Sequence, residues 1–347
     1  MFNTEALILV VDDEPSNLAV MREILSGEYK LVYAKDGASA LIAAEKHKPS
    51  LILLDIQLPD FDGYQICSQL KKNPNTEHIP IIFVTAMGSE LNEEIGLEMG
   101  AVDYITKPFS PAIILARMRL HLSLVKAAKL EESYCEAIHM LGAAGHYNDN
   151  DTDVHIWRMA AYAVRLADEC GWGFEQTKLL ELAAPMHDTG KIGIPDAILR
   201  KPDKLTADEW VIMRTHPTMG YDILNRGNAS VFKMAAEIAL YHHEKWDGSG
   251  YPHSLSGKNI PESARIVAIA DVFDALTMER SYKKAWSIED SIAEIKKGAG
   301  SHFDPQLVDK FEKILSDIVN IKKQWEFEGG GARNGANIPS WLSSASC

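Results

Sequence analysis

The sequence predicts a doubly wound α/β fold with five parallel strands, followed by a second, all-α domain. Up to about residue 105, short β-branched apolar runs alternate with amphipathic stretches, which is the pattern of a parallel sheet flanked by helices. From about residue 151 to residue 321 the chain shows helical periodicity and almost no strand-like alternation. The length of 347 residues also exceeds the roughly 250 to 300 at which a single core stops growing. We therefore expect two folded domains.

Local signals place the five strands and the helices between them. The strands are short apolar runs at residues 6–11, 31–34, 51–54, 81–84 and 102–105. Helical spacing of apolar residues occupies residues 15–26, 38–46, 63–72 and 90–99, and Gly100 is placed to end the last of these helices. Strands and helices thus alternate, as expected for a repeated βα unit.

A long helix is expected to connect the two domains. Helical spacing begins at Pro111 and continues toward Tyr134. Four apolar residues follow a heptad repeat before it lapses: Leu115, Met118, Leu122 and Val125. This short repeat makes a homodimer through the helix an expectation to test. The expected divisions are a first domain at 1–124, a connecting helix at 111–140, a second domain at 141–326, and a disordered tail at 327–347 that is rich in Gly, Ser, Ala and Asn.

The composition excludes several classes of protein. The formal charge of −14, without a Lys/Arg-rich block, argues against a nucleic-acid polymer as partner. No apolar run approaches the ~20 residues of a membrane-spanning helix, and the N-terminus lacks the features of a signal peptide. We therefore expect a cytoplasmic protein that does not enter a membrane.

Polar residues stand at the ends of four predicted strands. Asp12 and Asp13 follow the first strand, and Asp55 closes the third. In a doubly wound sheet these ends open into the ligand crevice, where gathered carboxylates suit Mg²⁺. Thr85 and Lys107 add a hydroxyl and a cation at the ends of the fourth and fifth strands. The set predicts phosphoryl transfer with Asp55 as nucleophile, although each Asp alone would more often cap a helix or a turn.

These five residues in this register resemble the receiver domain of two-component response regulators, over residues 7–124. The resemblance implies a flavodoxin-like fold in which Asp55 is the phosphoacceptor and Asp12 and Asp13 hold Mg²⁺. It also implies that Thr85 and Lys107 couple phosphorylation to a conformational change, and that the phosphoryl donor is a sensor histidine kinase or a phosphotransfer protein. Since a receiver has no output of its own, the second domain must supply one.

The second domain contains an ordered series of metal-ligating residue types. They are His187 and Asp188 in MHDTGK, His216 in THP, the pair His242 and His243, and Asp271 in IADVFDALT. Imidazoles mixed with carboxylates suit Fe, Mn or Zn better than Mg or Ca. A carboxylate placed between two metal ions can bridge them, which predicts a hydrolytic site. Histidines scattered by chance through a helical bundle would not explain this order.

Neighbouring residues could complete that site. Asp151 and His155 are four residues apart, so on a helix they share one face and could add two more ligands. Lys191 follows His187 by about one helical turn. Its ammonium could protonate a leaving oxygen or hold a phosphate.

A glycine-rich loop and two further cations lie downstream. In HHEKWDGSGYP, Gly248 and Gly250 permit backbone conformations closed to other residues and Pro252 fixes the exit, so a rigid loop should follow the paired histidines. Arg280 and Lys283 offer cations for phosphate oxygens, although such residues are more often part of a solvated surface.

Five motifs together resemble the HD-GYP domain, a subgroup of the HD phosphohydrolase superfamily, over residues 134–321: HDTGK, HPTMG, HHEKWDGSGYP, IVAIADVFDALT and HFDP. The resemblance implies a helical HD-type domain with two or three metal ions, commonly Fe or Mn, that cleaves cyclic di-GMP to pGpG and sometimes on to GMP. By position it implies these metal ligands: His155, His187, Asp188, His216, His242, His243 and Asp271. Asp188 would bridge two ions, Lys191 would be the catalytic lysine, and Tyr251, Arg280 and Lys283 would contact the substrate.

The sequence departs from the family pattern in three places. Asp151 stands where the family has a Glu that binds a third metal, so a third ion and the second cleavage stay open. Asp153 replaces a glycine, and Ser281 replaces the proline before Tyr282. None of these changes removes a ligand of the first two ions.

The resulting expectation is a response regulator whose phosphorylation controls a metal-dependent cyclic di-GMP phosphodiesterase. The direction of that control is open. One alternative is a phosphodiesterase for another nucleotide, such as hybrid cyclic GMP-AMP, and a second is a non-catalytic scaffold that binds a cyclic dinucleotide. The complete ligand set and Lys191 argue against the scaffold.

Overall fold

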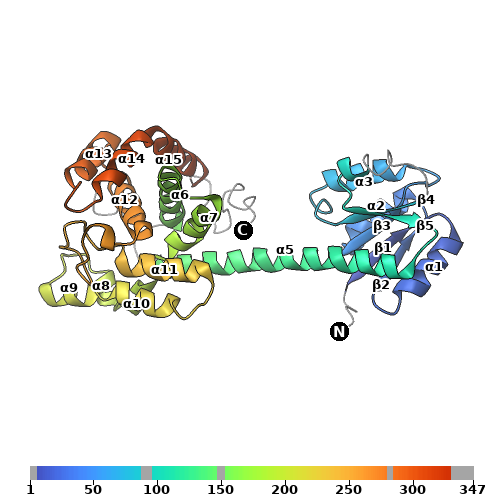
Figure 1. Ribbon diagram of the computed structural model, residues 1–347, viewed down its shortest axis with the longest axis horizontal. Helices are drawn as coiled ribbons and strands as arrows, with labels where there is room; N and C mark the ends of the chain where they lie inside the picture. Colours follow the sequence, from blue (N-terminus) through green and yellow to red (C-terminus); the bar gives the residue numbers. More distant parts are fainter. Residues whose placement is uncertain (1–5, 87–95, 147–152, 280–283, 330–347) are drawn as a thin grey trace. The chain divides into compact units, whose positions relative to one another are not determined.

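The computed structural model describes residues 6–86, 96–146, 153–279 and 284–329 (Figure 1). The chain forms two compact units, Met1–Glu131 and Glu132–Cys347, and each has its own hydrophobic core. None of the helices in the described ranges combines the length and the hydropathy that crossing a lipid bilayer requires.

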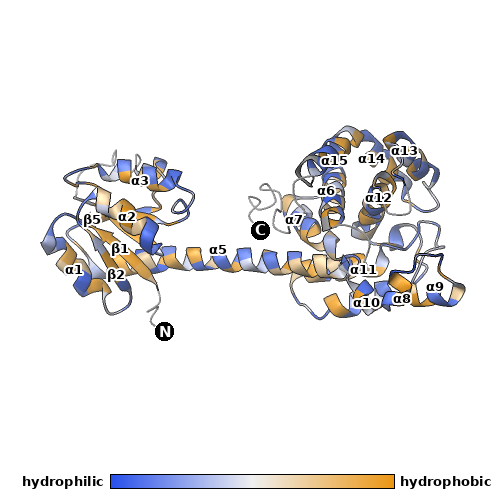
Figure 2. Cartoon of the chain, turned by 180° about the vertical axis from the view of Figure 1, so that it is seen from behind, coloured by the Kyte–Doolittle hydropathy of each residue, from blue (hydrophilic) through white to orange (hydrophobic). Residues whose placement is uncertain are grey.

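The first unit is built on a parallel sheet of five strands, as predicted, and the strand order is β2-β1-β3-β4-β5. The strands are β1 (Leu7–Val11), β2 (Lys30–Ala34), β3 (Leu51–Asp55), β4 (Ile81–Ala86) and β5 (Asp103–Lys107). The central strands are apolar along their length (Figure 2) because both faces of the sheet are covered. Alternate residues serve opposite faces, so Leu9 packs in one core cluster and Val10 in the other.

Helices cover both faces of this sheet. They are α1 (Pro15–Leu25), α2 (Gly37–His47) and α3 (Gly63–Lys72), and each lies within one residue of its predicted bounds. The carboxylates of Asp36 and Asp62 accept backbone N–H bonds at the starts of α2 and α3, which explains why both helices begin there. Residues 96–98 are helical, and the rest of the helix predicted at 90–99 lies outside the described residues.

Helix α5 (Pro111–His146) is longer than the sequence predicted. Met118 and Leu122 are buried in the core of the first unit, whereas Ile138 near the other end is buried in the core of the second. The short heptad, which made a homodimer through this helix an expectation to test, therefore packs largely in the first unit's own core.

The second unit is helical, as predicted, and its described residues form isolated β-bridges but no strand. Its helices are α6 (Asp153–Glu169), α7 (Phe174–Ala183), α8 (Asp196–Leu199), α9 (Ala207–Met213), α10 (His216–Leu224), α11 (Ser230–Tyr241), α12 (Glu262–Thr277), α13 (Ile288–Lys297), α14 (Pro305–Lys313) and α15 (Leu315–Gly329). Short 3₁₀ turns η1 (Ala184–Met186), η2 (Thr189–Gly193) and η3 (Gly257–Asn259) connect some of them. The rings of Tyr162, Phe273 and Phe311 pack edge to face at the centre of the bundle.

The disordered tail was predicted to start at residue 327, and this start is too early by three residues. Helix α15 continues to Gly329, so residues 327–329 are helical. Residues 330–347 lie outside the described residues.

Candidate metal centre and phosphoacceptor site

The polar residues predicted at the strand ends meet in the first unit. Lys107 at the end of β5 places its Nζ 2.9 Å from Asp12 Oδ2 and 2.6 Å from Asp55 Oδ2. Oxygen atoms of Asp12, Asp13 and Asp55 lie within 4.8 Å of one another, close enough to share a cation. Thr85 lies in β4, one residue before the strand ends. Burial raises the pKa of Asp55, because removing a carboxylate from water disfavours its charged form.

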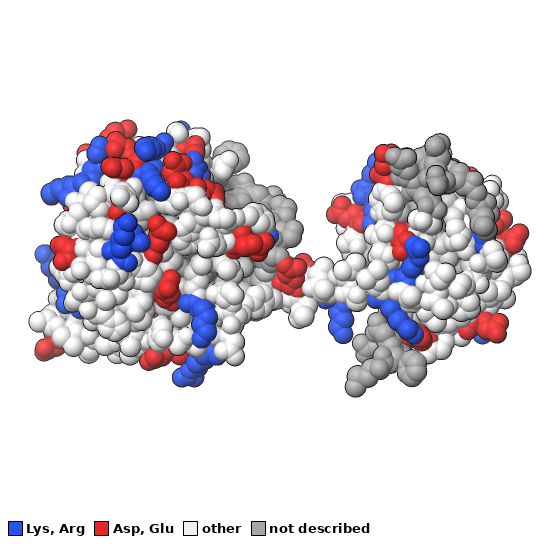
Figure 3. Space-filling model, in the orientation of Figure 1, with Lys and Arg blue, Asp and Glu red and all other residues white. Residues whose placement is uncertain are grey.

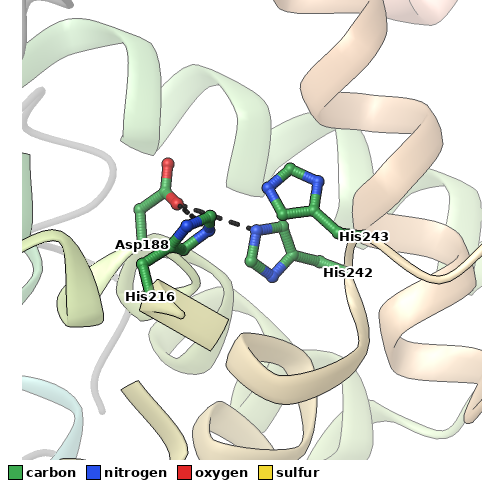
Figure 4. A group of neighbouring side chains, drawn as sticks. All are labelled: Asp188, His216, His242 and His243. Carbon is green, nitrogen blue, oxygen red and sulfur yellow. Dashed lines mark ion pairs between the residues drawn. The ribbon is translucent and has the colours of Figure 1, made fainter. Parts of the chain in front are cut away.

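In the second unit the predicted residues converge on the carboxylate of Asp188 (Figure 4). Its Oδ1 lies 3.3 Å from His216 Nε2 and 3.6 Å from His242 Nε2, and its Oδ2 lies 3.2 Å from His187 Nε2. His243 joins Asp188, His216 and His242 in a group whose ligand atoms all lie within 4.8 Å of one another. The junction of η1 and η2, the start of α10 and the residues after α11 supply these side chains.

A second group of ligand atoms adjoins the first. His155 on α6 places its Nε2 3.4 Å from Oδ1 of Asp271 on α12. These two residues and His187 form another set within 4.8 Å. The adjacent residues His187 and Asp188 therefore link the two groups, as expected for a centre that holds more than one ion.

Backbone carbonyls fix which nitrogen of each imidazole faces the centre. Nδ1 of His187, His216 and His242 lies 3.0, 2.7 and 3.0 Å from the carbonyl oxygen three residues earlier. Because a carbonyl only accepts, each Nδ1 carries the proton and each Nε2 presents a lone pair. Among the described residues, these three Nε2 atoms and Asp188 Oδ1 are buried without a hydrogen-bond partner. Converging lone pairs without donors repel one another unless a cation lies between them, so this donor set fits a metal site.

A side chain, rather than the backbone, orients His155. Its Nδ1 lies 2.5 Å from Asp274 Oδ2, and Arg158 donates to the same carboxylate at 2.5 and 2.6 Å. Burial would lower the pKa of His155, but its hydrogen bonds to Asp271 and Asp274 raise the pKa to about 10. A proton must therefore leave His155 before its Nε2 can bind a metal.

Close backbone packing brings the HDTGK motif next to His216 and the start of α10. A Cβ atom at Gly190 would lie 1.9 Å from the carbonyl oxygen of His216 and 2.4 Å from the amide nitrogen of Gly220. Only glycine allows η2 to lie this close to α10. The contact sets how near Asp188 lies to His216.

Cationic and aromatic side chains border the centre. Lys191 Nζ lies 2.7 Å from Asp188 Oδ2, and its catalytic role stays a prediction. The Tyr251 ring stacks on His243 at 4.8 Å, and burial raises the pKa of its hydroxyl. The guanidinium of Arg214, which no sequence argument singled out, lies 5.2 Å from the Tyr251 ring.

His146, the last residue of α5, was also missed. Its ligand atom lies within 4.8 Å of those of His187 and Asp188. Burial lowers the pKa of His146 to about 3, so its imidazole is neutral near pH 7. No motif marks this residue, because it stands alone in the sequence between small residues and Tyr147.

Three of the predicted site residues lie outside the described residues: Asp151, Arg280 and Lys283. Ser281, one of the departures from the family pattern, lies outside them too. Their expected roles rest on the sequence.

Comparisons with known families match both units. Residues 8–119 match the response regulator receiver domain, and residues 124–307 match the HD domain. The fold and the two clusters thus define a receiver joined to an HD domain with candidate metal-binding residues.

Three bacterial relatives are named as phosphodiesterases of cyclic dinucleotides. The cyclic di-GMP phosphodiesterase response regulator RpfG of Xanthomonas campestris pv. campestris is 37% identical, and the match covers 94% of this chain and 92% of the relative. A cyclic di-GMP phosphodiesterase of Thermotoga maritima is 32% identical, with 96% and 97% covered. The 3′3′-cGAMP-specific phosphodiesterase 2 of Vibrio cholerae is 47% identical, but the match covers only 56% of this chain and 37% of the relative. The chain belongs to the family of response regulators that carry an HD domain, which confirms the resemblance drawn from its motifs.

Proposed function

We propose that the chain is a response regulator whose HD domain is a metal-dependent phosphodiesterase that hydrolyses cyclic di-GMP to pGpG. The observation that carries the proposal is the convergence of buried Nε2 lone pairs on the Asp188 carboxylate. The two relatives matched along nearly their whole length, both named cyclic di-GMP phosphodiesterases, support the substrate. Hybrid cyclic GMP-AMP is the second candidate, because a relative 47% identical over part of this chain is specific for it.

Two metal positions follow from the ligand groups. Asp188, His216, His242 and His243 would hold one ion, and His155, His187 and Asp271 would hold the other with Asp188 as the bridge. Mixed imidazole and carboxylate ligands suit iron, manganese or zinc, and the resemblance to the HD-GYP domain favours iron or manganese. A third ion at Asp151 would allow further cleavage to GMP. When bound, the ions would activate water and neutralise charge on the scissile phosphate.

The chain's own residues then handle the substrate and the proton. Hydrolysis adds the hydroxyl group of water to phosphorus and breaks the bond between phosphorus and the ribose 3′ oxygen. The remaining proton of that water is transferred to the ribose 3′ oxygen. Lys191, whose Nζ lies 2.7 Å from Asp188 Oδ2, would deliver a proton to this oxygen. Tyr251 offers a ring face beside His243 for substrate stacking, and Arg280 and Lys283 would bind phosphate oxygens.

The receiver would control this activity through Asp55. A sensor histidine kinase or a phosphotransfer protein would phosphorylate Asp55, with Mg²⁺ held by Asp12, Asp13 and Asp55. Lys107 already lies against the accepting carboxylate, where it would bind the new phosphoryl oxygens with Thr85. Helix α5 continues from the receiver core into the HD domain and would carry the change.

A homodimer through α5 would use a different face from the predicted heptad. Leu120, Leu124 and Leu130 are 55, 57 and 72% exposed on the helix, whereas Met118 and Leu122 are buried. Charged replacements at Leu120 and Leu124 should convert a dimer to a monomer in light scattering after size exclusion.

On the face shown in Figure 3, the described basic side chains lie among acidic ones without forming a stripe, which suits a small ligand better than a nucleic-acid polymer.

Product analysis tests the proposed activity. Protein purified without oxygen and loaded with Fe²⁺ or Mn²⁺ is incubated with cyclic di-GMP or with 3′3′-cGAMP, and Asp188→Ala serves as the control. Conversion of cyclic di-GMP to pGpG that disappears in the variant supports the proposal. Faster cleavage of 3′3′-cGAMP than of cyclic di-GMP would identify hybrid cyclic GMP-AMP as the substrate. If neither compound is cleaved, a non-catalytic scaffold explains the site better.

A further inference from the structure

His146 is a buried histidine whose ring makes no hydrogen bond within the described structure. It is 2% exposed, and both Nδ1 and Nε2 are buried without a partner among the described residues. A histidine in a protein core normally satisfies at least one ring nitrogen, because burying an unpaired polar atom is unfavourable. Within the part of the chain that the structure describes, the ring of His146 therefore lacks the hydrogen bond that an ordinary core histidine would have.

The ring lies against the proposed metal ligands. Its centroid is 5.1 Å from that of His187 and 6.1 Å from that of His155. One of its nitrogens lies within 4.8 Å of ligand atoms of His187 and Asp188. Metal–nitrogen and metal–oxygen bonds are about 2.0 to 2.2 Å long, so two ligand atoms of one ion can be at most about 4.4 Å apart. Small movements of the side chains are enough to bring atoms within 4.8 Å of one another to this separation.

Backbone packing holds His146 in this place. A Cβ atom at Gly145 would lie 2.9 Å from Thr189 Cα, and one at Gly142 would lie 3.2 Å from Pro185 Cβ. The last turn of α5 thus packs directly on the segments that flank His187 and Asp188. The position of His146 is therefore fixed by the same packing that positions the two ligands.

We propose that His146 is a further ligand of the ion shared by His187 and Asp188, so that the metal centre includes the last residue of α5. The proposal rests on the metal dependence given under the proposed function. It adds an imidazole from a helix that begins in the receiver, and it does not depend on Asp151. His139 offers a matched comparison, because it lies on the same helix and packs its ring against Trp157 instead.

Metal content and spectroscopy test this assignment without measuring turnover. The full chain, His146→Phe and His139→Phe are freed of metal with a chelator and titrated with Mn²⁺. Bound ions per chain are counted by mass spectrometry, and the ions are examined by electron paramagnetic resonance. We expect at least tenfold weaker binding of one ion and a changed spectrum in His146→Phe, unchanged behaviour in His139→Phe, and partial recovery in His146→Glu, which restores a ligand.

Each outcome bears on the assignment. If His146→Phe binds Mn²⁺ with the affinity and spectrum of the wild type, His146 is a packing residue and the proposal is wrong. If His146→Phe does not fold, His146→Gln replaces it, and nitrogen hyperfine couplings of the wild type and His146→Gln decide whether one imidazole has been lost. Failure of the wild type itself to bind Mn²⁺ or Fe²⁺ would instead overturn the proposed function, and this proposal with it.

Discussion

Asp274 holds Nδ1 of His155 at 2.5 Å, although the two residues are 119 positions apart in the chain. The same carboxylate receives two bonds from Arg158, and both Asp274 and Arg158 are almost fully buried. Asp274 therefore has two tasks: it aims His155 Nε2 at the metal centre, and it compensates the charge of a buried guanidinium.

Asp274→Asn should damage both stability and metal binding. It leaves the charge of Arg158 without a carboxylate to compensate it inside the bundle, which costs about 3 to 5 kcal/mol. Loss of the partner of His155 should weaken metal binding about 10- to 100-fold. Thermal unfolding by circular dichroism and Mn²⁺ titration check these two effects. Asp317→Asn is the matched control, because it breaks a partly exposed ion pair with Arg165, which lies on α6 like Arg158. This substitution should cost no more than about 1 kcal/mol.

Gly190→Ala should disrupt the contact between η2 and α10. The added methyl group would meet backbone atoms at 1.9 and 2.4 Å, and backbone cannot rotate away as a side chain can. We expect a loss of about 1 to 3 kcal/mol or more, together with a lower metal content. Gly27→Ala places its methyl group in open space at a backbone conformation that alanine can adopt, and it should change the unfolding midpoint little. Equal effects of the two substitutions would contradict this account.

Lys191→Met should separate catalysis from metal binding. The lysine contacts Asp188 but has no lone pair to give a metal while it is protonated. The variant should therefore keep its metal content and lose about 10²- to 10⁴-fold in kcat. Lys201→Met, which removes a pair with Glu209, is the control. An unchanged kcat in Lys191→Met would show that another group supplies the proton.

Asp55→Asn should abolish phosphorylation and with it any response of the phosphodiesterase to a phosphoryl donor. Incubation with acetyl phosphate, followed by gel electrophoresis that resolves phosphoprotein, measures the modification. Asp62→Asn is a suitable control, because Asp62 caps α3 and asparagine caps a helix as well as aspartate does. Phosphorylation that persists in Asp55→Asn would place the phosphoacceptor elsewhere.

Local signals predicted most of the first unit correctly. Its strands lie within two residues of the predicted bounds, because apolar runs and turn residues mark strand ends in the sequence itself. Helix α5 continues six residues beyond its predicted end at residue 140, and the lapse of the heptad at Lys129 and Glu132 does not interrupt it. Both residues favour helix and lie exposed, so the helix continues to His146.

The predicted metal ligands that the structure describes come together, whereas the residues that support them were missed. Asp274 follows Asp271 by three residues on α12, and Arg158 follows His155 by three on α6. This spacing places each pair on one helix face and could have suggested both supporting residues. His146 has no such signal, because its position depends on how the end of α5 packs against a segment some 40 residues later in the chain.

The carbonyl acceptors of His187, His216 and His242 have a consequence for how such sequences can diverge. Every residue type has a backbone carbonyl, so the residues three positions before these histidines can change without altering the proton that each imidazole carries. His155 lacks this freedom, because its acceptor is the side chain of Asp274. Drift near the first three histidines should therefore leave the tautomer of each ring intact, whereas a substitution at the distant position 274 changes the centre directly.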